Sequence, residues 1–242
     1  MIDTHCHIDL YSNPLQIANE CERLGIVTIG MTNLPSHFEL GYKHLFSYKK
    51  VRLALGMHPL HAESYEKELP IFIRNIDKTS YIGEVGLDFS SKGIASKNTQ
   101  LNTFKCILSA VNEKKKIISL HSRKAEKEIF QNLRQSNIKA AIFHWYSGSL
   151  SLIKDIAEAG FMFSINPAMI KSKSGQEIIR RIPIANILTE SDGPFISIKD
   201  RLVKPNDIIV VQDYLSSVWK ISGRNVDLRI HENFSKLLQV II

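Results

Sequence analysis

The sequence predicts an α/β fold, a (β/α)8 TIM barrel with C-terminal helices, and three observations favour it. Short apolar runs rich in β-branched residues alternate with segments of helical periodicity over about the first 190 residues. Eight such strands are each followed by a helical segment, an alternation typical of parallel sheets. No linker or low-complexity stretch interrupts them, so residues 1–242 are expected to form one domain. An open doubly wound sheet is the alternative, because periodicity does not show whether a sheet closes.

The first strand and helix have clear local signals. Residues 3–7 read Asp-Thr-His-Cys-His, and an extended strand would place the two histidines on one face. In residues 13–24 apolar side chains recur at helical spacing, and Gly25 follows, a residue typical of a helix C-terminus. Residues 26–30 are then a short run rich in β-branched residues, which predicts the second strand.

The same alternation continues to residue 190. Short apolar runs predict further strands at residues 51–57, 80–83, 117–120, 140–143, 161–165 and 187–190. Helical patterns predict intervening helices at residues 36–48, 65–76, 97–115, 124–134, 149–159 and 175–181. Two more patterns, Asp207–Trp219 and Asp227–Leu238, are expected to be helices that pack on the outside or one end of the barrel.

Composition and charge are those of a soluble globular protein with an anionic partner. Hydrophobic residues make up 44% of the chain and charged residues 23%, values that argue against disorder. The 31 Lys and Arg residues outnumber the 24 Asp and Glu residues. The resulting net charge of +7 would attract nucleic acid or a phosphate ester.

The cysteines indicate a reducing compartment. Cys6, Cys21 and Cys106 form no CxxC motif and are odd in number, which argues against a disulfide framework. The sequence has no basic segment followed by an apolar run at its start, and no stretch of about 18 apolar residues. We therefore expect a cytoplasmic protein with no membrane association.

Residue types that bind metals stand at the ends of the predicted strands. They are His5, His7, His58, Glu84, His121, His144 and Asp192. Five of the nine histidines belong to this set, whereas a purely structural distribution would scatter them over helices and loops. Because the carboxyl ends of parallel strands meet at one end of a barrel, these side chains are expected to converge there.

Six of these residues, all except His58, exceed the three or so protein ligands that a catalytic zinc takes. Such a set suits two divalent ions, which at about 4 Å apart activate water and stabilise the attacking and leaving oxygens of a phosphoryl transfer. Glu84 suits a bridging role through its two oxygens, and Asp192 suits proton transfer from the water. The residue types alone do not distinguish among zinc, manganese, magnesium and iron as the bound metal.

Five stretches along nearly the whole chain carry a family resemblance. They are Asp3–His7, Gly83–Asp88, His121–Arg123, His144–Gly148 and Thr189–Pro194. In this order they resemble the motifs of the TatD family of metal-dependent deoxyribonucleases, within the amidohydrolase-like barrels. The resemblance implies a TIM barrel and a divalent-metal nuclease that acts on DNA, often from the 3′ end.

The same resemblance implies a role for each ligand. His5 and His7 would hold one metal ion, His121 and His144 the other, and Glu84 would bridge them. Asp192 would bind metal and serve the water. The implied partner is DNA, as single strands or 3′ ends. TatD-like chains also occur in bacterial anti-phage gene clusters, so protein partners in a defence or repair complex are a further expectation.

Three stretches depart from the family pattern, and all three are expected to face the substrate. Relatives carry His-Pro-His after the third strand, where this chain has His58-Pro59-Leu60-His61, so only His58 corresponds. The segment after Asp88 is compact, and residues 196–207 lack the usual glycine and Arg-Asn pattern. Asp88 itself is expected to orient a ligand or a loop.

Four residues are candidates for contact with the substrate. His58 would touch the substrate or hydrogen-bond a metal ligand. Arg123 would reach a phosphate, the alternative being a surface arginine at the start of the next helix. Trp145 or Tyr146 would stack on a base of a frayed single strand, the alternative being that one of them packs under the loop.

Two other functions compete with DNA cleavage. A related barrel hydrolase would use the same metals on an ester, a lactone or an amide. The basic charge argues against it, as does the absence of the strand-four lysine that many such relatives use in place of a bridging glutamate. A non-catalytic subunit would keep the metal site only as a scaffold, and the complete ligand set argues against that reading.

Overall fold

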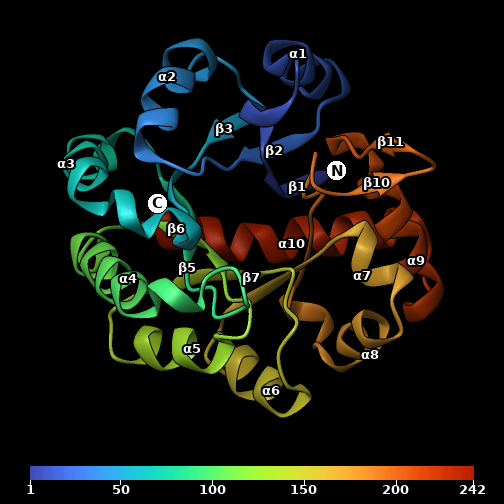
Figure 1. Cartoon of the computed structure of the whole chain (residues 1–242). Helices are drawn as coiled ribbons and strands as arrows, with labels where there is room; N and C mark the ends of the chain where they lie inside the picture. Colours follow the sequence, from blue (N-terminus) through green and yellow to red (C-terminus); the bar gives the residue numbers. More distant parts are fainter.

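A computed structural model describes residues 1–242 and shows parallel strands surrounded by helices (Figure 1). The strands of the barrel are β1 (Ile2–Cys6), β2 (Val27–Gly30), β3 (Val51–Leu53), β4 (Leu55–Met57), β5 (Tyr81–Gly86), β6 (Ile117–His121), β7 (Ala140–His144), β8 (Met162–Ile165) and β9 (Ile187–Thr189). They pair in chain order, and every pair is parallel. The predicted α/β TIM barrel is confirmed.

The barrel has two seams where the ladder of backbone hydrogen bonds is interrupted. One lies at Ala54, which divides the strand expected at 51–57 into β3 and β4 in separate sheets. The other lies between the first and last strands, where the hydroxyl of Thr4 donates to the carbonyl of Thr189 at 3.1 Å. This contact brings β1 beside β9, which distinguishes a closed barrel from an open doubly wound sheet.

Helices cover the outside of the barrel. They are α1 (Pro14–Leu24), α2 (Pro35–Leu45), α3 (Tyr65–Asn75), α4 (Lys97–Val111), α5 (Glu126–Arg134), α6 (Leu150–Glu158), α7 (Pro167–Lys171), α8 (Lys173–Arg181), α9 (Ile209–Trp219) and α10 (Gly223–Ile241). Their ends follow local chemistry. In α1 the side chain of Asn13 accepts a hydrogen bond from the Gln16 N–H at 3.1 Å, and Gly25 at φ 68° ends the helix as predicted.

The C-terminal helix α10 closes the amino-terminal end of the barrel. Figure 1 shows it crossing behind the strands. The Met1 amino group lies 3.4 Å from the Asp227 carboxylate, and Asn233 Nδ2 donates to the carbonyl of Ile187, the first residue of β9, at 2.9 Å. The predicted packing role of this helix is confirmed, and the opposite, carboxyl-terminal end of the strands stays free for loops.

Two elements differ from the sequence prediction. Residues 196–207, expected as a loop, contain the antiparallel hairpin β10 (Ser197–Ile198) and β11 (Arg201–Leu202). Its turn residues, Lys199 and Asp200, have φ values of 47° and 60°, a left-handed turn that is usually signalled by glycine or asparagine. The short helix α7 was also not predicted, because five residues are too few to show a helical period.

The core is one contiguous cluster of 57 buried apolar residues, so the whole chain shares a single hydrophobic interior. Along β6 the side chains of Ile118 and Leu120 are fully buried. At the carboxyl end of the strand, His121 instead faces a pocket. None of the helices combines the length and the apolar character that crossing a lipid bilayer requires.

Candidate metal centre

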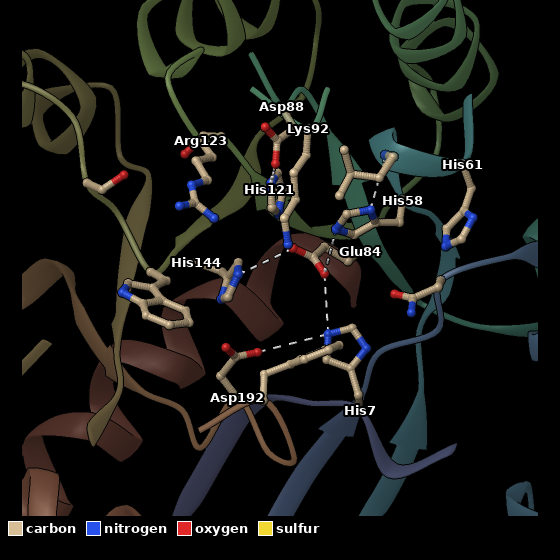
Figure 2. Close-up of a pocket in the computed structure, with 16 residues that line it drawn as sticks. His7, His58, His61, Glu84, Asp88, Lys92, His121, Arg123, His144 and Asp192 are labelled. Carbon is tan, nitrogen blue, oxygen red and sulfur yellow. Dashed lines mark hydrogen bonds and ion pairs between the residues drawn. The ribbon is translucent and has the colours of Figure 1, made fainter. Parts of the chain in front are cut away.

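A pocket of about 680 Å³ opens at the carboxyl ends of the barrel strands. Its residues come from the ends of β1, β4, β5, β6 and β7 and from the segments after β2 and β9, and Figure 2 labels the His, Asp, Glu, Lys and Arg side chains among them. In barrels of this kind, binding and catalytic residues lie at this end because the strands converge there. The convergence predicted from the sequence is therefore present in the fold.

His5 and His7 face the same side of the chain at the end of β1. Their Nε2 atoms are 3.2 Å apart, and they lie 3.7 Å and 3.3 Å from Glu84 Oε2. His5 Nδ1 pairs with the hydroxyl of Ser119 on β6 at 2.9 Å, which fixes the ring with its Nε2 atom toward Glu84. Two imidazole nitrogens and a carboxylate oxygen thus meet at one point.

Glu84 lies on β5 between two groups of histidines. Its Oε2 atom faces His5 and His7, and its Oε1 atom lies 2.7 Å from His121 Nδ1 and 3.3 Å from His144 Nε2. The side chain is buried, so its charge is compensated by these imidazoles and not by water. Each carboxylate oxygen therefore serves a different side of the pocket.

Gly86 allows β5 to approach the ligand strand β6. It pairs with His121 in the register, and a Cβ atom on it would lie 2.0 Å from the His121 carbonyl oxygen. Its φ of 140° is also a value that other residues rarely adopt. A glycine at this position is thus required for the spacing of Glu84 and His121.

His121 and His144 are each held by a second carboxylate on the ring nitrogen that faces away from Glu84. His121 Nε2 donates to Asp88 Oδ2 at 2.8 Å, and His144 Nδ1 donates to Glu190 Oε1 at 3.1 Å. Because a carboxylate accepts, His121 Nε2 and His144 Nδ1 carry protons, and the nitrogens directed at Glu84 are His121 Nδ1 and His144 Nε2. Asp88 thus contacts a predicted ligand, as the expected orienting role requires.

Glu190 is a site residue that the sequence analysis missed. It is fully buried, and Oε1 also accepts from the Trp145 N–H at 3.2 Å and from Asn166 Nδ2 at 2.9 Å, while Oε2 accepts from the Ser164 hydroxyl. Its position two residues before Asp192, at the end of the last strand, was the available signal. The carboxylate is not exposed in the pocket, so it acts on the site through His144.

Asp192 reaches the pocket from the segment after β9. Its N–H donates to the His5 carbonyl at 2.9 Å, and its Oδ1 lies 3.8 Å from His5 Nε2 and 4.0 Å from His7 Nε2. Its φ of 46° is a left-handed conformation uncommon for aspartate, and strain of this kind gathers at functional sites. The first strand and the segment after the last strand thus place ligand-type side chains on one side of the cluster.

Burial and neighbouring charges shift the pKa values of the clustered side chains in opposite directions. Burial, with smaller contributions from other carboxylates, raises the pKa of Asp192 to about 7. Burial lowers the pKa of His5 to about 4, helped by the neighbouring His144. Burial opposes protonation of His121, yet Glu84 and Asp88 outweigh it and raise the pKa of that ring to about 9. The shift at His121 indicates that the carboxylates around this ring favour a positive charge on that side of the pocket.

His58 differs from the other histidines in its hydrogen bonding. Its Nδ1 accepts the backbone N–H of Leu60 at 3.2 Å, and its Nε2 lies 3.6 Å from Glu84 Oε2. Burial lowers its pKa to about 3. A neutral ring whose Nδ1 is an acceptor carries its proton on Nε2, so that atom is a donor aimed into the pocket and has no lone pair for a metal.

The donor set fits divalent metal ions. Three groups have ligand atoms within 4.8 Å of one another, namely His5/His7/Glu84, His5/His144/Asp192 and His58/Glu84/His121. Neutral imidazole nitrogens together with carboxylate oxygens are typical ligands of zinc, manganese and iron. The third group contains His58 where the sequence analysis expected His144, and the hydrogen bond from Leu60 argues against His58 as a ligand.

The predicted substrate-contact residues divide into two kinds. His58, Arg123 and Trp145 line the pocket. Tyr146 does not: it is 1% exposed, its ring packs edge-on against Phe163, and its hydroxyl donates to the Ser149 carbonyl at 2.7 Å. The expectation of base stacking by Tyr146 is therefore wrong, because the chain turns this side chain into the core.

Comparison with known proteins gives consistent matches over the whole chain. The family model described as TatD-related DNase matches residues 2–239. Human deoxyribonuclease TATDN3 is 24% identical over 257 residues, covering 98% of this chain and 94% of its own. A metal-dependent hydrolase of Methanocaldococcus jannaschii, itself uncharacterized, is 24% identical over 250 residues, covering 98% and 96%. The crystal structure of YJJV, a TatD homolog from Escherichia coli, superimposes with a TM-score of 0.88 at 20% identity, covering 98% and 97%.

Proposed function

Because this chain belongs to the TatD-related DNase family, a family of metal-dependent hydrolases, we propose that it cleaves phosphodiester bonds of DNA with two divalent ions. The observation that carries the proposal is the position of Glu84, whose two carboxylate oxygens each face a different pair of histidines. A carboxylate in this position is suited to bridge two cations. A single metal site would have no use for the second pair.

In this proposal His5 and His7 would hold one ion, His121 and His144 would hold the other, and Glu84 would bridge them. Asp192 adds a carboxylate on the side of His5 and His7. When bound, two such ions supply a water of lowered pKa and stabilise negative charge on the phosphate. The nitrogen-rich donor set favours zinc, manganese or iron over magnesium, which prefers oxygen ligands.

Asp192 would take the proton of the water, and His58 would donate a hydrogen bond to the substrate. The carboxylate of Asp192 would accept a proton from the attacking water, because its Oδ1 lies on the side of His5 and His7. His58 Nε2–H donates a hydrogen bond to a phosphate oxygen, since its Nδ1 is occupied by the Leu60 N–H. The side chain of Arg123, which makes no ion pair within the chain, is free to bind phosphate.

An end-labelled DNA assay with metal-stripped and reloaded protein tests the proposal. We expect DNA shortening from one end that requires added manganese, zinc or iron and is lost in Glu84→Ala and Asp192→Asn. Glu158→Ala is the matched control, because this exposed α6 carboxylate pairs only with Lys154. Single- and double-stranded RNA in the same assay gives the choice of nucleic acid, and 3′ against 5′ labels give the polarity expected from the 3′ end.

Faster hydrolysis of a lactone, an ester or an amide than of DNA would overturn the proposal in favour of a related barrel hydrolase. Stoichiometric metal binding without any cleavage would favour a scaffold subunit. A cytoplasmic location, a single domain over residues 1–242, and protein partners in antiviral defence or repair stay predictions. Their direct measurements are fractionation, limited proteolysis and copurification.

A further inference from the structure

Two walls of different chemistry rise above the metal-ligand cluster. Arg123 and Lys92, from the segments after β6 and β5, line the pocket on the side of Asp88 and His121, as Figure 2 shows. Trp145 and Phe195 line it from the segments after β7 and β9. Cationic side chains therefore line the pocket beside His121, and aromatic side chains line it beside His144 and His7.

Phe195 is an exposed aromatic ring fixed beside a ligand. It is 59% exposed, its ring meets that of His7 edge-on at 4.9 Å between centroids, and its N–H donates to the Asp192 carbonyl at 3.0 Å. A phenyl ring exposed to this extent adds little to the core. Exposed apolar surface inside a polar pocket is typical of a binding site.

Trp145 is turned toward the pocket by an unusual backbone conformation. Its φ is 40°, and its N–H donates to the buried Glu190 carboxylate at 3.2 Å, which holds the turn. The side chain is 38% exposed, whereas that of Tyr146 is buried in the core. Backbone strain in a bulky residue persists where the surroundings impose it, commonly at ligand sites.

The cationic wall has no partner within the protein. Neither Lys92 nor Arg123 makes an ion pair, and both side chains are exposed at the pocket. Unpaired cations beside a pocket attract phosphate, and the planar guanidinium of arginine matches the geometry of phosphate oxygens. The two walls together match a nucleotide, which has a charged phosphate on one side and a flat apolar base on the other.

We propose that Trp145 and Phe195 stack on the unpaired base of a nucleotide at the end of a nucleic-acid strand, while Lys92 and Arg123 hold its phosphates. The proposal rests on the function proposed above and identifies residues that determine substrate specificity. Stacking of this kind tolerates any base, because every base has a flat face. A base within a duplex is already paired and stacked, so the pocket requires a free or frayed end.

The test compares wild type, Trp145→Ala, Phe195→Ala and the double variant on two single-stranded oligonucleotides, one normal and one with abasic residues at the reacting end. We expect each single variant to lose about 10-fold in kcat/KM on the normal strand and little on the abasic strand. Phe46→Ala is the matched control, because this ring is 63% exposed but lies outside the metal-centre pocket. Equal losses on both strands, or no loss, would overturn the stacking role.

A second comparison uses a blunt duplex of the same sequence. Wild type should cleave the single strand faster than the duplex, and the double variant should lose most of that preference. An unchanged ratio in the double variant would overturn the proposal.

Fluorescence separates failure of this inference from failure of the proposed nuclease activity. Trp219→Phe leaves Trp145 as the only tryptophan, since the chain has two. Quenching of Trp145 by a normal oligonucleotide, but much less by an abasic one, would support stacking even if no DNA were cut. Active cleavage without such quenching would overturn the stacking inference alone.

Discussion

The pocket joins a floor of buried ligands to a rim of exposed side chains. The floor consists of His5, His7, Glu84, His121, His144 and Asp192. The rim consists of Lys92, Arg123, Trp145 and Phe195. Floor residues are tied to other strands, as His121 is tied to two carboxylates, whereas the rim side chains make no hydrogen bond or ion pair.

This difference indicates separate roles for the two regions. The floor is positioned by folding itself, before any substrate is present, as electrostatic catalysis requires. The rim gains its partners only from the substrate. Floor substitutions should therefore reduce turnover of every substrate, and rim substitutions should change the discrimination between substrates.

The largest expected effect comes from Glu84→Ala on the floor. Loss of the carboxylate between two histidine pairs should reduce kcat by at least about 10³-fold, since metal-ion catalysis supplies several kcal/mol. Bound metal per chain, measured after gel filtration, should fall with it, and the increase in Tm on adding metal should disappear. Retention of both the metal and the activity would contradict the assignment of Glu84.

Asp88→Asn and Glu190→Gln should have the next largest effects, although neither residue is proposed as a ligand. Each removes the carboxylate that selects a histidine tautomer, which typically costs about 10- to 100-fold in metal affinity or activity. Titration with zinc while activity is followed would measure the loss. Recovery of much of the activity at high metal concentration is expected of a positioning role, and a loss that metal does not rescue would contradict it.

His58 lies at the boundary between floor and rim. Substitutions of His58 test whether it is a hydrogen-bond donor or a metal ligand. His58→Gln retains an N–H group at the end of the side chain, whereas His58→Ala removes it. A hydrogen bond to a charged group contributes about 1.5 to 3 kcal/mol, so alanine should lose about 10- to 100-fold in kcat/KM and glutamine much less. Unchanged metal content in both variants should accompany this result. Loss of metal in either would identify His58 as a ligand.

At the rim, Arg123→Gln and Lys92→Gln should weaken binding of single-stranded DNA more than they slow turnover. Each should reduce the slope of log affinity against log salt by about 0.7, the value for one phosphate contact on a single strand. Lys154→Gln on the exposed face of α6 is the control and should leave the slope unchanged. If both rim variants kept the wild-type slope of log affinity against log salt, the phosphates would not contact Arg123 or Lys92.

The smallest effect is expected at the hairpin that follows Phe195. Arg201 binds Asp207 through two bonds of 2.7 Å and 2.6 Å, and the pKa of Asp207 is lowered by this pair although burial opposes the shift. A lowered folded pKa stabilises the protein above the ordinary value near 3.8 and loses that stabilisation as the pH falls through the folded value. Asp207→Asn should cost at most about 1 kcal/mol at pH 7, because Arg201 is exposed. Urea unfolding at pH 7 and pH 3 should give a smaller difference at pH 3.

Much of the floor was predictable because it depends on local order along the chain. Six of the eight predicted strands end at or beside a ligand-type residue, and parallel strands bring their ends together whatever the loops do. His5, His7, Glu84, His121, His144 and Asp192 follow from that rule. The eight strands followed from β-branched and apolar runs, and the helices from their period.

Tertiary structure alone decided how individual side chains are turned. Trp145 and Tyr146 are adjacent and both aromatic, yet the left-handed backbone of Trp145 sends one to the pocket and the other to the core. The division of residues 51–57 at Ala54 depends on pairing with different neighbours on its two sides.

The sequence by itself thus determined the barrel and the chemistry of its floor, since residue type and spacing are local properties. Only the tertiary structure decided the partners of the histidine nitrogens, the buried role of Glu190 and the presence of Trp145 and Phe195 in one pocket. These depend on distances between segments far apart in the chain, such as the 3.1 Å from His144 to Glu190. No periodicity along a single segment encodes such a distance.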